Sequence, residues 1–320
     1  MGSRAVPTPV GSRAVTAPDG RSTARGGLLV IGDVVTDVVA RHTKELARGT
    51  DTAALIRTLP GGAGANVACW AARSGCSDVR LLARVGADSA AWHREALRRA
   101  GVRCLLAVDD EAPTATVVAL VDSTAERTFL TDSGAVLRLS PGDWSPSMLD
   151  GIGHLHLSGY LLFAATSRAT VLLALREARR RRITVSVDPA SAGFLAELGV
   201  DRFLTAVEGV DLLLPNTDEA HLLTGFTEPA DAAVELSLRV PRVVVTLGEG
   251  GALLAVSGTV TRRIPAVPVQ GAVDSTGAGD AFTGGLLAAL LSGADDASAV
   301  AAGCRSGAEA VTRVGGRPGP

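Results

Sequence analysis

A chain of 320 residues that is 47% hydrophobic can bury a large core, as one α/β domain or as two smaller domains. Its formal net charge of −2 gives no general attraction for nucleic acid or for an anionic membrane. Lys44 is the only lysine, and no glycine-rich stretch is followed by one, which excludes a Walker-type phosphate loop. The four cysteines form no Cys-x-x-Cys pair, so we expect reduced thiols in a cytoplasmic protein.

The first 26 residues repeat the sequence GSRAV at positions 2–6 and 11–15, among proline, serine and threonine. This composition is typical of a flexible low-complexity tail, and no apolar segment marks a signal peptide. Apolar runs elsewhere fall short of the roughly 18–20 residues that a membrane span needs, so no membrane partner is expected. We therefore expect a tail at 1–26, a folded domain over 27–316 and a C-terminal end at 317–320.

Short apolar strands alternate with helical patterns between residues 27 and 101. Strands are expected at 27–32, 54–60 and 79–86, and helices at 66–75 and 89–101. The segments 36–60 and 102–131 break this rhythm, because strand-like runs follow one another with only turns between them. We expect extra strands within these two segments to form a small sheet that stands off the main domain as a lid.

After residue 150 the alternation of strands and helices resumes. Helices are expected at 167–182, 193–205, 217–224, 278–292 and 295–312, with a strand pair over 252–264. Alternation of this kind favours a mostly parallel sheet with helices on both faces, so the predicted fold class is α/β.

Four consecutive arginines, residues 179–182, lie at the end of one of these helices. Positive charge at a helix C-terminus suits the helix dipole, so a solvated face is the simplest interpretation. No aromatic neighbours provide a platform on which bases could stack, so nucleic acid is not expected as a partner.

Polar residues and glycines follow the predicted strands, at the edge where an open α/β sheet binds its ligands. Asp33 and Asp37 follow the first strand, and carboxylates there can accept hydrogen bonds from hydroxyl groups. Loop solvation is the alternative, and it is favoured for Asp33. The stretch GGAGANVA, residues 61–68, contains Gly62 and Asn66. It predicts either a plain glycine turn with an asparagine cap or a close backbone approach to a ligand.

Two further motifs each have a structural and a functional interpretation. Asn216 and Glu219 form an Asn-x-x-Glu pattern that resembles a capping box, and both side chains would also lie near a metal–phosphate group. Thr246, Gly248 and Gly251 follow a buried strand, where they predict either a hairpin or a glycine loop against a flat ligand.

The stretch DSTGAGDAFTGG, residues 274–285, carries the most specific signal. Gly277 and Gly279 lie directly before Asp280, where a buried helix begins. Free amides at a helix N-terminus bind anions, so residues 277–280 are predicted to hold a phosphoryl group. Asp280 beside them is predicted to take a proton from an attacking hydroxyl.

Together and in this order, the motifs resemble those of the ribokinase-like (PfkB) family of carbohydrate kinases, over about residues 27–316. GGAGAN is similar to the family's first signature, and DSTGAGDAF to its second. The resemblance implies a three-layer α/β/α core with a small β-sheet lid, and dimers joined through the lids. It also implies transfer of the γ-phosphoryl group of ATP to an alcohol, with Mg²⁺.

The resemblance further implies a role for each motif. Asp280 would be the catalytic base, with Gly277, Ala278 and Gly279 as the anion hole. The acceptor's hydroxyls would meet Asp37, Gly62 and Asn66, and Asp33 is a further candidate for this contact. Asn216 and Glu219 would act near Mg²⁺ and phosphate, and the nucleotide would contact Thr246, Gly248 and Gly251. Asp274 and the Thr276 carbonyl would form the monovalent-cation (K⁺) site seen in many members.

Three departures from the ribokinase pattern make ribose itself an uncertain acceptor. Val35 replaces an asparagine, Ala63 replaces a lysine, and the sequence SGY at 158–160 replaces an expected glutamate. The presumed lid contains Phe129 as its one aromatic residue, which favours a sugar or sugar acid over a nucleoside. A nucleoside kinase of the same fold and a non-catalytic sugar or nucleotide sensor are the alternatives.

Overall fold

The computed structural model describes residues 26–124 and 126–319, so nearly all of the predicted tail lies outside the described residues. At its centre is strand β1 (Gly27–Ile31), which is buried along its whole length. Its side chains alternate between two cores, with Leu29 on one face of the sheet and Leu28 on the other. A continuous apolar strand therefore takes the position that needs burial on both faces.

The main sheet has nine strands in the order β13-β12-β11-β10-β9-β8-β1-β4-β5. All neighbours run parallel except β12 and β13, which extend one edge in antiparallel fashion. The remaining strands are β4 (Val79–Gly86), β5 (Val102–Asp109), β8 (Ile152–Ser158), β9 (Thr184–Asp188), β10 (Leu212–Leu213), β11 (Arg242–Thr246), β12 (Ala252–Val256) and β13 (Thr259–Ile264).

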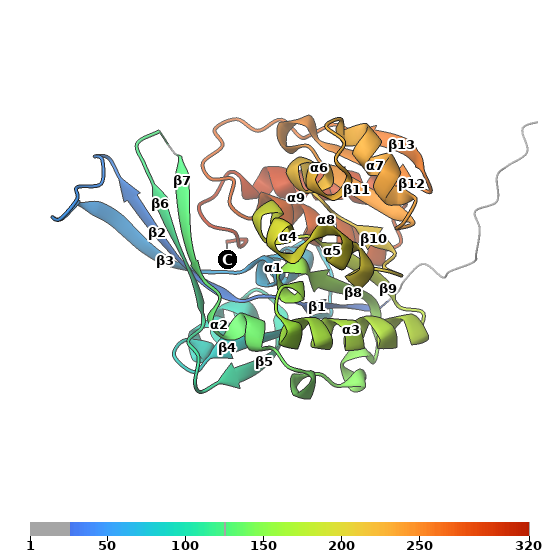
Figure 1. Ribbon diagram of the computed structural model, residues 1–320, viewed down its shortest axis with the longest axis horizontal. Coiled ribbons are helices and arrows are strands. Elements are labelled where there is room, and N and C mark those ends of the chain that lie inside the picture. Colours follow the sequence, from blue (N-terminus) through green and yellow to red (C-terminus); the bar gives the residue numbers. More distant parts are fainter. Residues whose placement is uncertain (1–25, 125, 320) are drawn as a thin grey trace, which may run out of the picture.

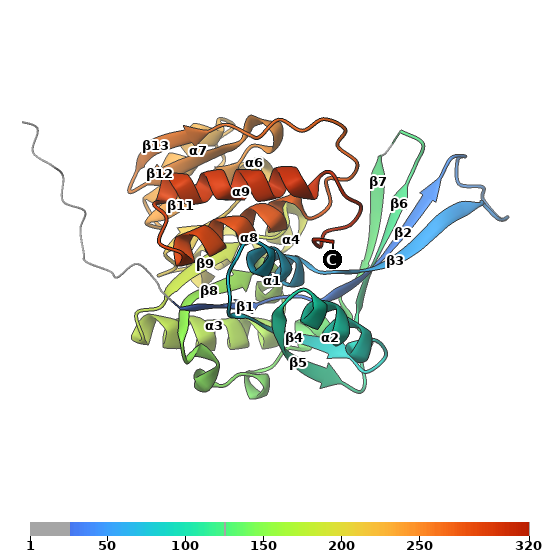
Figure 2. The ribbon, with the colours of Figure 1, turned by 180° about the vertical axis from the view of Figure 1, so that it is seen from behind.

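Helices cover both faces of this sheet, which confirms the predicted three-layer α/β/α architecture (Figures 1 and 2). One face carries α3 (Ala165–Arg180), α4 (Ala192–Leu198), α5 (Val200–Ala206), α6 (Thr217–Thr224) and α7 (Pro229–Ser237). The other carries α1 (Ala63–Arg73), α2 (Ala90–Arg99), α8 (Ala278–Leu291) and α9 (Asp296–Ala310). The helix predicted over 193–205 is divided into α4 and α5 at Gly199, whose φ of 90° interrupts the helix.

A second sheet of four strands, here called the lid sheet, stands off one end of the core (Figure 1). Its order is β3-β2-β6-β7, from β2 (Val35–His42), β3 (Ala54–Gly61), β6 (Ala115–Val121) and β7 (Arg127–Asp132). The expectation that 102–131 belongs wholly to the lid is wrong for its first part. Residues 102–109 form β5, which pairs in parallel with β4 and closes an edge of the main sheet.

The chain crosses between the two sheets in several places. Val35, the first residue of β2, pairs with Gly61, the last residue of β3, so this pair marks the junction of the lid sheet with the core. Both ribbon views place the C-terminal end between the lid sheet and the core. No helix within residues 26–124 and 126–319 is long and apolar enough to cross a membrane.

Candidate active site

The N-terminus of α8 is built as predicted, with glycine where only glycine fits. Gly277 has a φ of 73°, and a Cβ there would lie 2.5 Å from the Cα of Gly316. The amide of Ala278 donates to the Ser275 carbonyl at 3.2 Å, so it is already used within the turn. First-turn amides have no intrahelical acceptor, and no heavy atom lies within 4 Å of where a Gly279 side chain would begin. The first turn of α8 is therefore open at the Cα of Gly279.

Asp280, in the first turn of α8, is held by a residue 214 positions earlier. The side-chain amide of Asn66 donates to Asp280 Oδ2 at 2.8 Å. Asn66 lies inside α1 and is buried, and its Oδ1 has no partner among the described residues. The two signature motifs thus meet through a direct hydrogen bond. The alternative that Asn66 caps α1 does not hold, because its side chain bonds to α8.

Burial raises the pKa of the Asp280 carboxyl to about 8. The Asn66 hydrogen bond opposes this shift, whereas the negative charges of Asp188, Asp33 and Asp37 add to it. A carboxylate with a pKa near neutral pH is suited to accept a proton during a reaction.

Asp33 serves as a cap for α1 from a distant position in the chain. Its Oδ2 accepts the Ala63 amide at 2.7 Å, and its Oδ1 accepts the Gly64 amide at 3.1 Å. The Ser158 hydroxyl donates to the same Oδ1 at 2.9 Å. These bonds favour a capping role for Asp33 over the contact with acceptor hydroxyls that the resemblance implied.

Asp37 lies on β2, against the glycine at the junction. A Cβ at Gly61 would collide with the Asp37 carboxylate, so a larger residue there would require that side chain to move. Gly62 is more tightly constrained, because its φ is 99° and a Cβ would lie 2.6 Å from the Asp33 carbonyl oxygen. Burial raises the pKa of Asp37 to about 6, Arg317 opposes the shift, and Asp33 and Asp274 add to it.

Asn216 and Glu219 form the capping box at the start of α6 that their spacing predicts. Asn216 Oδ1 accepts the Glu219 amide at 2.9 Å, and Glu219 Oε2 accepts the Asn216 amide at 2.9 Å. Thr246, at the end of β11, is brought beside Asn216 by a parallel bridge. Burial and the neighbouring Asp188 raise the pKa of the buried Glu219 to about 8. The structural interpretation of this motif is therefore correct, and its functional interpretation stays open.

The glycine loop after β11 turns the chain into the antiparallel strand β12. Leu247 and Gly251 close the turn with an N–H to carbonyl bond of 2.8 Å. Gly248 has a φ of 56°, and no heavy atom lies within 4 Å of where its side chain would begin. The loop is a hairpin, as one of the two interpretations predicts, and open space adjoins Gly248. Contact of this loop with a flat ligand stays a prediction.

Asp274 joins the α8 loop to the segment after α9. Its Oδ1 accepts the Thr276 amide at 2.9 Å, and its Oδ2 accepts the Gly315 amide at 3.0 Å. The Val311 carbonyl accepts the amides of Val273 and Asp274. The predicted cation site thus consists of a buried carboxylate fixed by backbone amides.

The donor set of this region fits magnesium bound together with a nucleotide. Within the described residues, no group of three or more His, Cys, Asp or Glu is placed to hold a metal. Mg²⁺ in kinases is commonly bound through one or two carboxylates together with substrate phosphates and waters. Glu219, with the carboxylate of Asp188 close enough to raise its pKa, supplies such oxygens.

Three residues that the sequence analysis did not select contribute to this region. Ser158 bonds to Asp33, Asp188 ends β9, and Arg317 Nη2 donates to the Gly61 carbonyl at 2.9 Å. The rule that selected Asp33 applies equally to Asp188, because it also follows a buried strand. Arg317 lies beyond the predicted domain boundary at residue 316, so that boundary falls too early.

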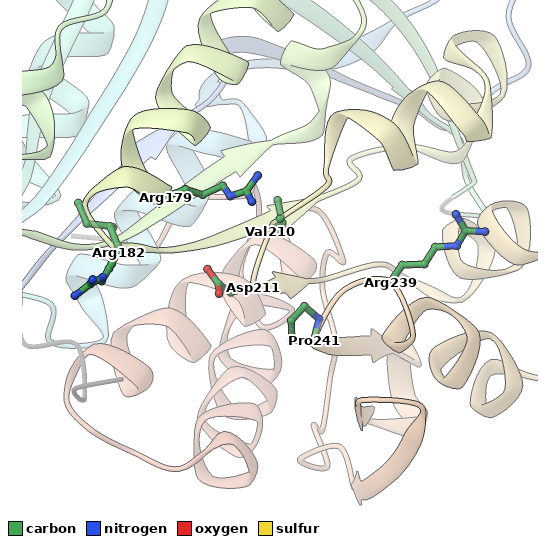
Figure 3. A pocket seen from close by; sticks show the side chains of 8 residues that line it. Arg179, Arg182, Val210, Asp211, Arg239 and Pro241 are labelled. Carbon is green, nitrogen blue, oxygen red and sulfur yellow. The ribbon is translucent and has the colours of Figure 1, made fainter. Parts of the chain in front are cut away.

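A separate hollow of about 430 Å³ lies at the amino ends of the strands, opposite the carboxyl ends that carry the candidate site (Figure 3). It is lined by Arg179, Arg182, Ile183, Gly209, Val210, Asp211, Arg239 and Pro241, which precede β9, β10 and β11 or end α3. The guanidinium groups of Arg182 and Arg239 point away from one another (Figure 3). Arg180 and Arg181, within the same arginine run, form ion pairs with Glu177. This hollow contains none of the predicted site residues.

Comparison with known proteins gives the class of this site. The profile of pfkB family carbohydrate kinases matches residues 26–320. The protein belongs to this family. It is 33% identical to a fructokinase from Klebsiella pneumoniae over 277 residues, which cover 83% of this chain and 84% of that protein. The predicted family and enzyme class, an ATP-dependent carbohydrate kinase, are therefore confirmed.

Other relatives in the family differ in the acceptor that their names state. A 2-dehydro-3-deoxygluconokinase from Thermoproteus tenax is 31% identical over 261 residues, covering 76% of this chain and 79% of that protein. Among solved structures, a putative ribokinase II from E. coli in complex with ATP and Mg²⁺ matches with a TM-score of 0.80. It is 25% identical and covers 91% of this chain and 94% of that chain. These neighbours confirm the ribokinase-like fold.

Proposed function

We propose that this carbohydrate kinase transfers the γ-phosphoryl group of ATP to a hydroxyl of a small sugar or sugar acid, with Asp280 as the general base. The observation that carries the proposal is the placement of Asp280 in the first turn of α8, bonded to Asn66 at 2.8 Å. Asp280, whose pKa is raised, thus lies in the first turn of the helix whose N-terminus would bind the phosphoryl group.

In the proposed reaction, Asp37, Gly62 and Asn66 orient the acceptor through its hydroxyls. Asp280 accepts the proton of the reacting hydroxyl, whose oxygen attacks the γ-phosphorus as the bond to the β-phosphate oxygen breaks. The amides of Gly279 and Asp280 stabilise the negative charge on the transferred group. Asp33 keeps α1, and with it Asn66, in position.

The nucleotide side of the site is assigned in the same way. Thr246, Gly248 and Gly251 contact the nucleotide, and Asn216 and Glu219 lie toward its phosphates. Mg²⁺, when bound there, would neutralise charge on the phosphate oxygens. Asp274 and the Thr276 carbonyl form the candidate K⁺ site, whose occupation would fix the loop that precedes α8.

The test compares Asp280→Asn with the parent protein. We measure ADP release from MgATP with fructose, ribose, 2-dehydro-3-deoxygluconate and adenosine as acceptors, with and without K⁺. Loss of a general base typically costs about 10²–10⁴-fold in rate, and MgATP binding by calorimetry should persist. The control is Asp33→Asn, which should lower stability more than it lowers the rate of the folded protein. Near-normal turnover by Asp280→Asn would refute the assignment.

One observation keeps nucleosides among the acceptors to be tested. Tyr160, Phe163 and Phe194 form an aromatic cluster after β8 and β9, with ring centroids 5.0–6.1 Å apart. Burial raises the pKa of Tyr160, and the charges of Asp33 and Asp280 add to the shift, so its phenol lies near the site. A base could stack there, which is why adenosine belongs in the panel.

We also propose that the protein dimerises through the lid sheet. Its two outer strands expose large apolar side chains, namely Leu55 and Ile56 on β3 and Phe129 and Leu130 on β7, each more than half exposed. Leu55 and Ile56 lie on one outer strand and Phe129 and Leu130 on the other, so each edge of the lid sheet offers apolar surface of the kind found at protein–protein contacts.

A further inference from the structure

The segment that follows α9 is attached to the proposed site at several points. The Gly315 amide donates to Asp274 Oδ2 at 3.0 Å, and the Gly316 carbonyl accepts the Trp70 indole N–H at 2.9 Å. A Cβ at Gly316 would collide with the Asn66 side chain, and a Cβ at Gly277 would lie 2.5 Å from the Gly316 Cα. These contacts fix the segment that leads to Arg317 against residues of both signature motifs.

Arg317 is a buried cation with few partners. Its Nη2 donates to the Gly61 carbonyl, whereas Nε and Nη1 are buried and meet no acceptor among the described residues. Burial of a guanidinium without its full set of acceptors costs several kcal/mol, so a functional reason for its position is the natural explanation.

Arg317 bonds to Gly61, and the Asp37 carboxylate lies against the same glycine. Gly61 ends β3 at the junction of the lid sheet with the core, and the Asp37 carboxylate lies where a Cβ of residue 61 would be. Arg317 is also the positive charge that acts on Asp37, against the negative charges of Asp33 and Asp274. Asp280 interacts with Asp37 from α8 as well. Among the charges that act on Asp37, Arg317 is the one that favours its ionised form, whereas the neighbouring acids oppose it.

We infer that Arg317 is a positioning residue for the acceptor, which fixes the junction at Gly61 and keeps the Asp37 carboxylate ionised and in place. The inference rests on the proposed function, in which Asp37 accepts hydrogen bonds from the acceptor's hydroxyls. A protonated Asp37 would lose part of that capacity, because one of its oxygens would then carry a proton.

The experiment compares Arg317→Ala, Arg317→Lys and the control Arg313→Ala. Arg313 lies in the same segment but pairs with the partly exposed Glu309. With the panel acceptor that gives the fastest ADP release, we expect Arg317→Ala to raise the acceptor KM about tenfold, as for loss of a charge-assisted contact. The KM for MgATP should change by less than about twofold, and Arg313→Ala should match the parent protein.

A pH titration separates positioning from general support of the fold. Acceptor dissociation constants are measured by calorimetry in an Asp280→Asn background, so that Asp280 does not titrate. Binding should weaken as the pH falls through the pKa of Asp37, and Arg317→Ala should move this midpoint to higher pH. Arg317→Lys, which keeps the charge, should retain the midpoint. An unchanged midpoint and an unchanged ratio of the two KM values, together with a lower melting temperature, would overturn the inference.

A measurement without acceptor keeps the inference testable if the proposed function fails. Hydrogen exchange over residues 35–42 and 54–61 reports whether β2 and β3 are held at the junction. Faster exchange there in Arg317→Ala than in Arg313→Ala supports the contact with Gly61, even if no panel acceptor is phosphorylated. Equal exchange in the two variants would show that Arg317 does not hold the junction.

Discussion

Replacement of Asn66 by alanine tests how the two signature motifs act on one another. Asn66 donates its side-chain amide to Asp280 Oδ2 at 2.8 Å, and this bond favours the ionised carboxylate. Without the donor, the pKa of Asp280 should rise above its value of about 8. The proposed base works only when ionised, so activity at neutral pH should fall.

The magnitude follows from the energy of such a bond. A hydrogen bond to a charged group contributes about 1.5–3 kcal/mol. At 1.36 kcal/mol per pKa unit, the shift is about one to two units upward. Well below the midpoint, one unit lowers the ionised fraction, and with it kcat, about tenfold. Above both midpoints the two proteins should converge.

The assay is kcat against pH from 6 to 10 at saturating acceptor, so that weaker binding by Asn66→Ala does not enter. Asn66→Asp should move the midpoint further upward, because it replaces a donor by a like charge. Asn216→Ala truncates the chain's other asparagine, in the capping box of α6, and should leave the midpoint unchanged. A uniform loss of kcat at every pH, with the midpoint in place, would refute a role of Asn66 through the Asp280 pKa.

Three further predictions concern stability and assembly. Gly277→Ala should lower the free energy of unfolding in urea by at least about 2 kcal/mol, because φ is 73° and Gly316 fills the space of a Cβ. Gly279→Ala meets no atom, so it should keep the stability yet lower turnover by obstructing the proposed anion hole; equal stability losses in the two variants would contradict this. Burial lowers the pKa of His156 to about 3. Between about pH 6.5, the pKa in the unfolded state, and about pH 3, only the unfolded state binds a proton at this residue. Lowering the pH over this range should therefore reduce the free energy of unfolding by about 1.4 kcal/mol per pH unit. His156→Gln should flatten that slope, and an unchanged slope would exclude the residue. Ile56→Lys should convert a dimer to a monomer in sedimentation velocity, and a parent protein that is monomeric throughout would reject the proposed contact.

Most of the fold was predictable from local patterns, and each wrong or missing prediction has an identifiable cause. β1, β4 and α6 lie close to where apolar periodicity places them, because strong periodicity and clear turns agree there. Residues 102–109 were assigned to the lid because the strand-like runs after them belong to it, and pairing with β4 is a tertiary fact that no local pattern shows. The helix α7 (Pro229–Ser237) was not predicted, although Pro229 at its first position is a recognised start signal.

The site was predictable where its residues are close together in the sequence. It was not predictable where the fold brings distant residues into contact. Gly277 and Asp280 are neighbours in sequence, so their geometry is local and the sequence shows it. The contact of Arg317 with Gly61 joins residues 256 positions apart, and no spacing or composition around Arg317 indicates it. The same limit applies to Asp33, whose capping of α1 depends on how β1 and α1 pack.

The hydrogen-bond donors of the carboxylates are consistent with the division of roles in the proposed mechanism. Asp33 accepts two amides and a hydroxyl, and Asp274 accepts two amides, so these acids hold backbone segments together. Asp280 accepts a single side-chain donor, and burial then raises its pKa far enough for proton transfer near neutral pH. A further amide directed at Asp280 would lower its pKa and weaken it as a base. In the proposed mechanism, the glycine turn before α8 leaves the amides of Gly279 and Asp280 to the phosphoryl group, while a lone asparagine from α1 orients the proposed base.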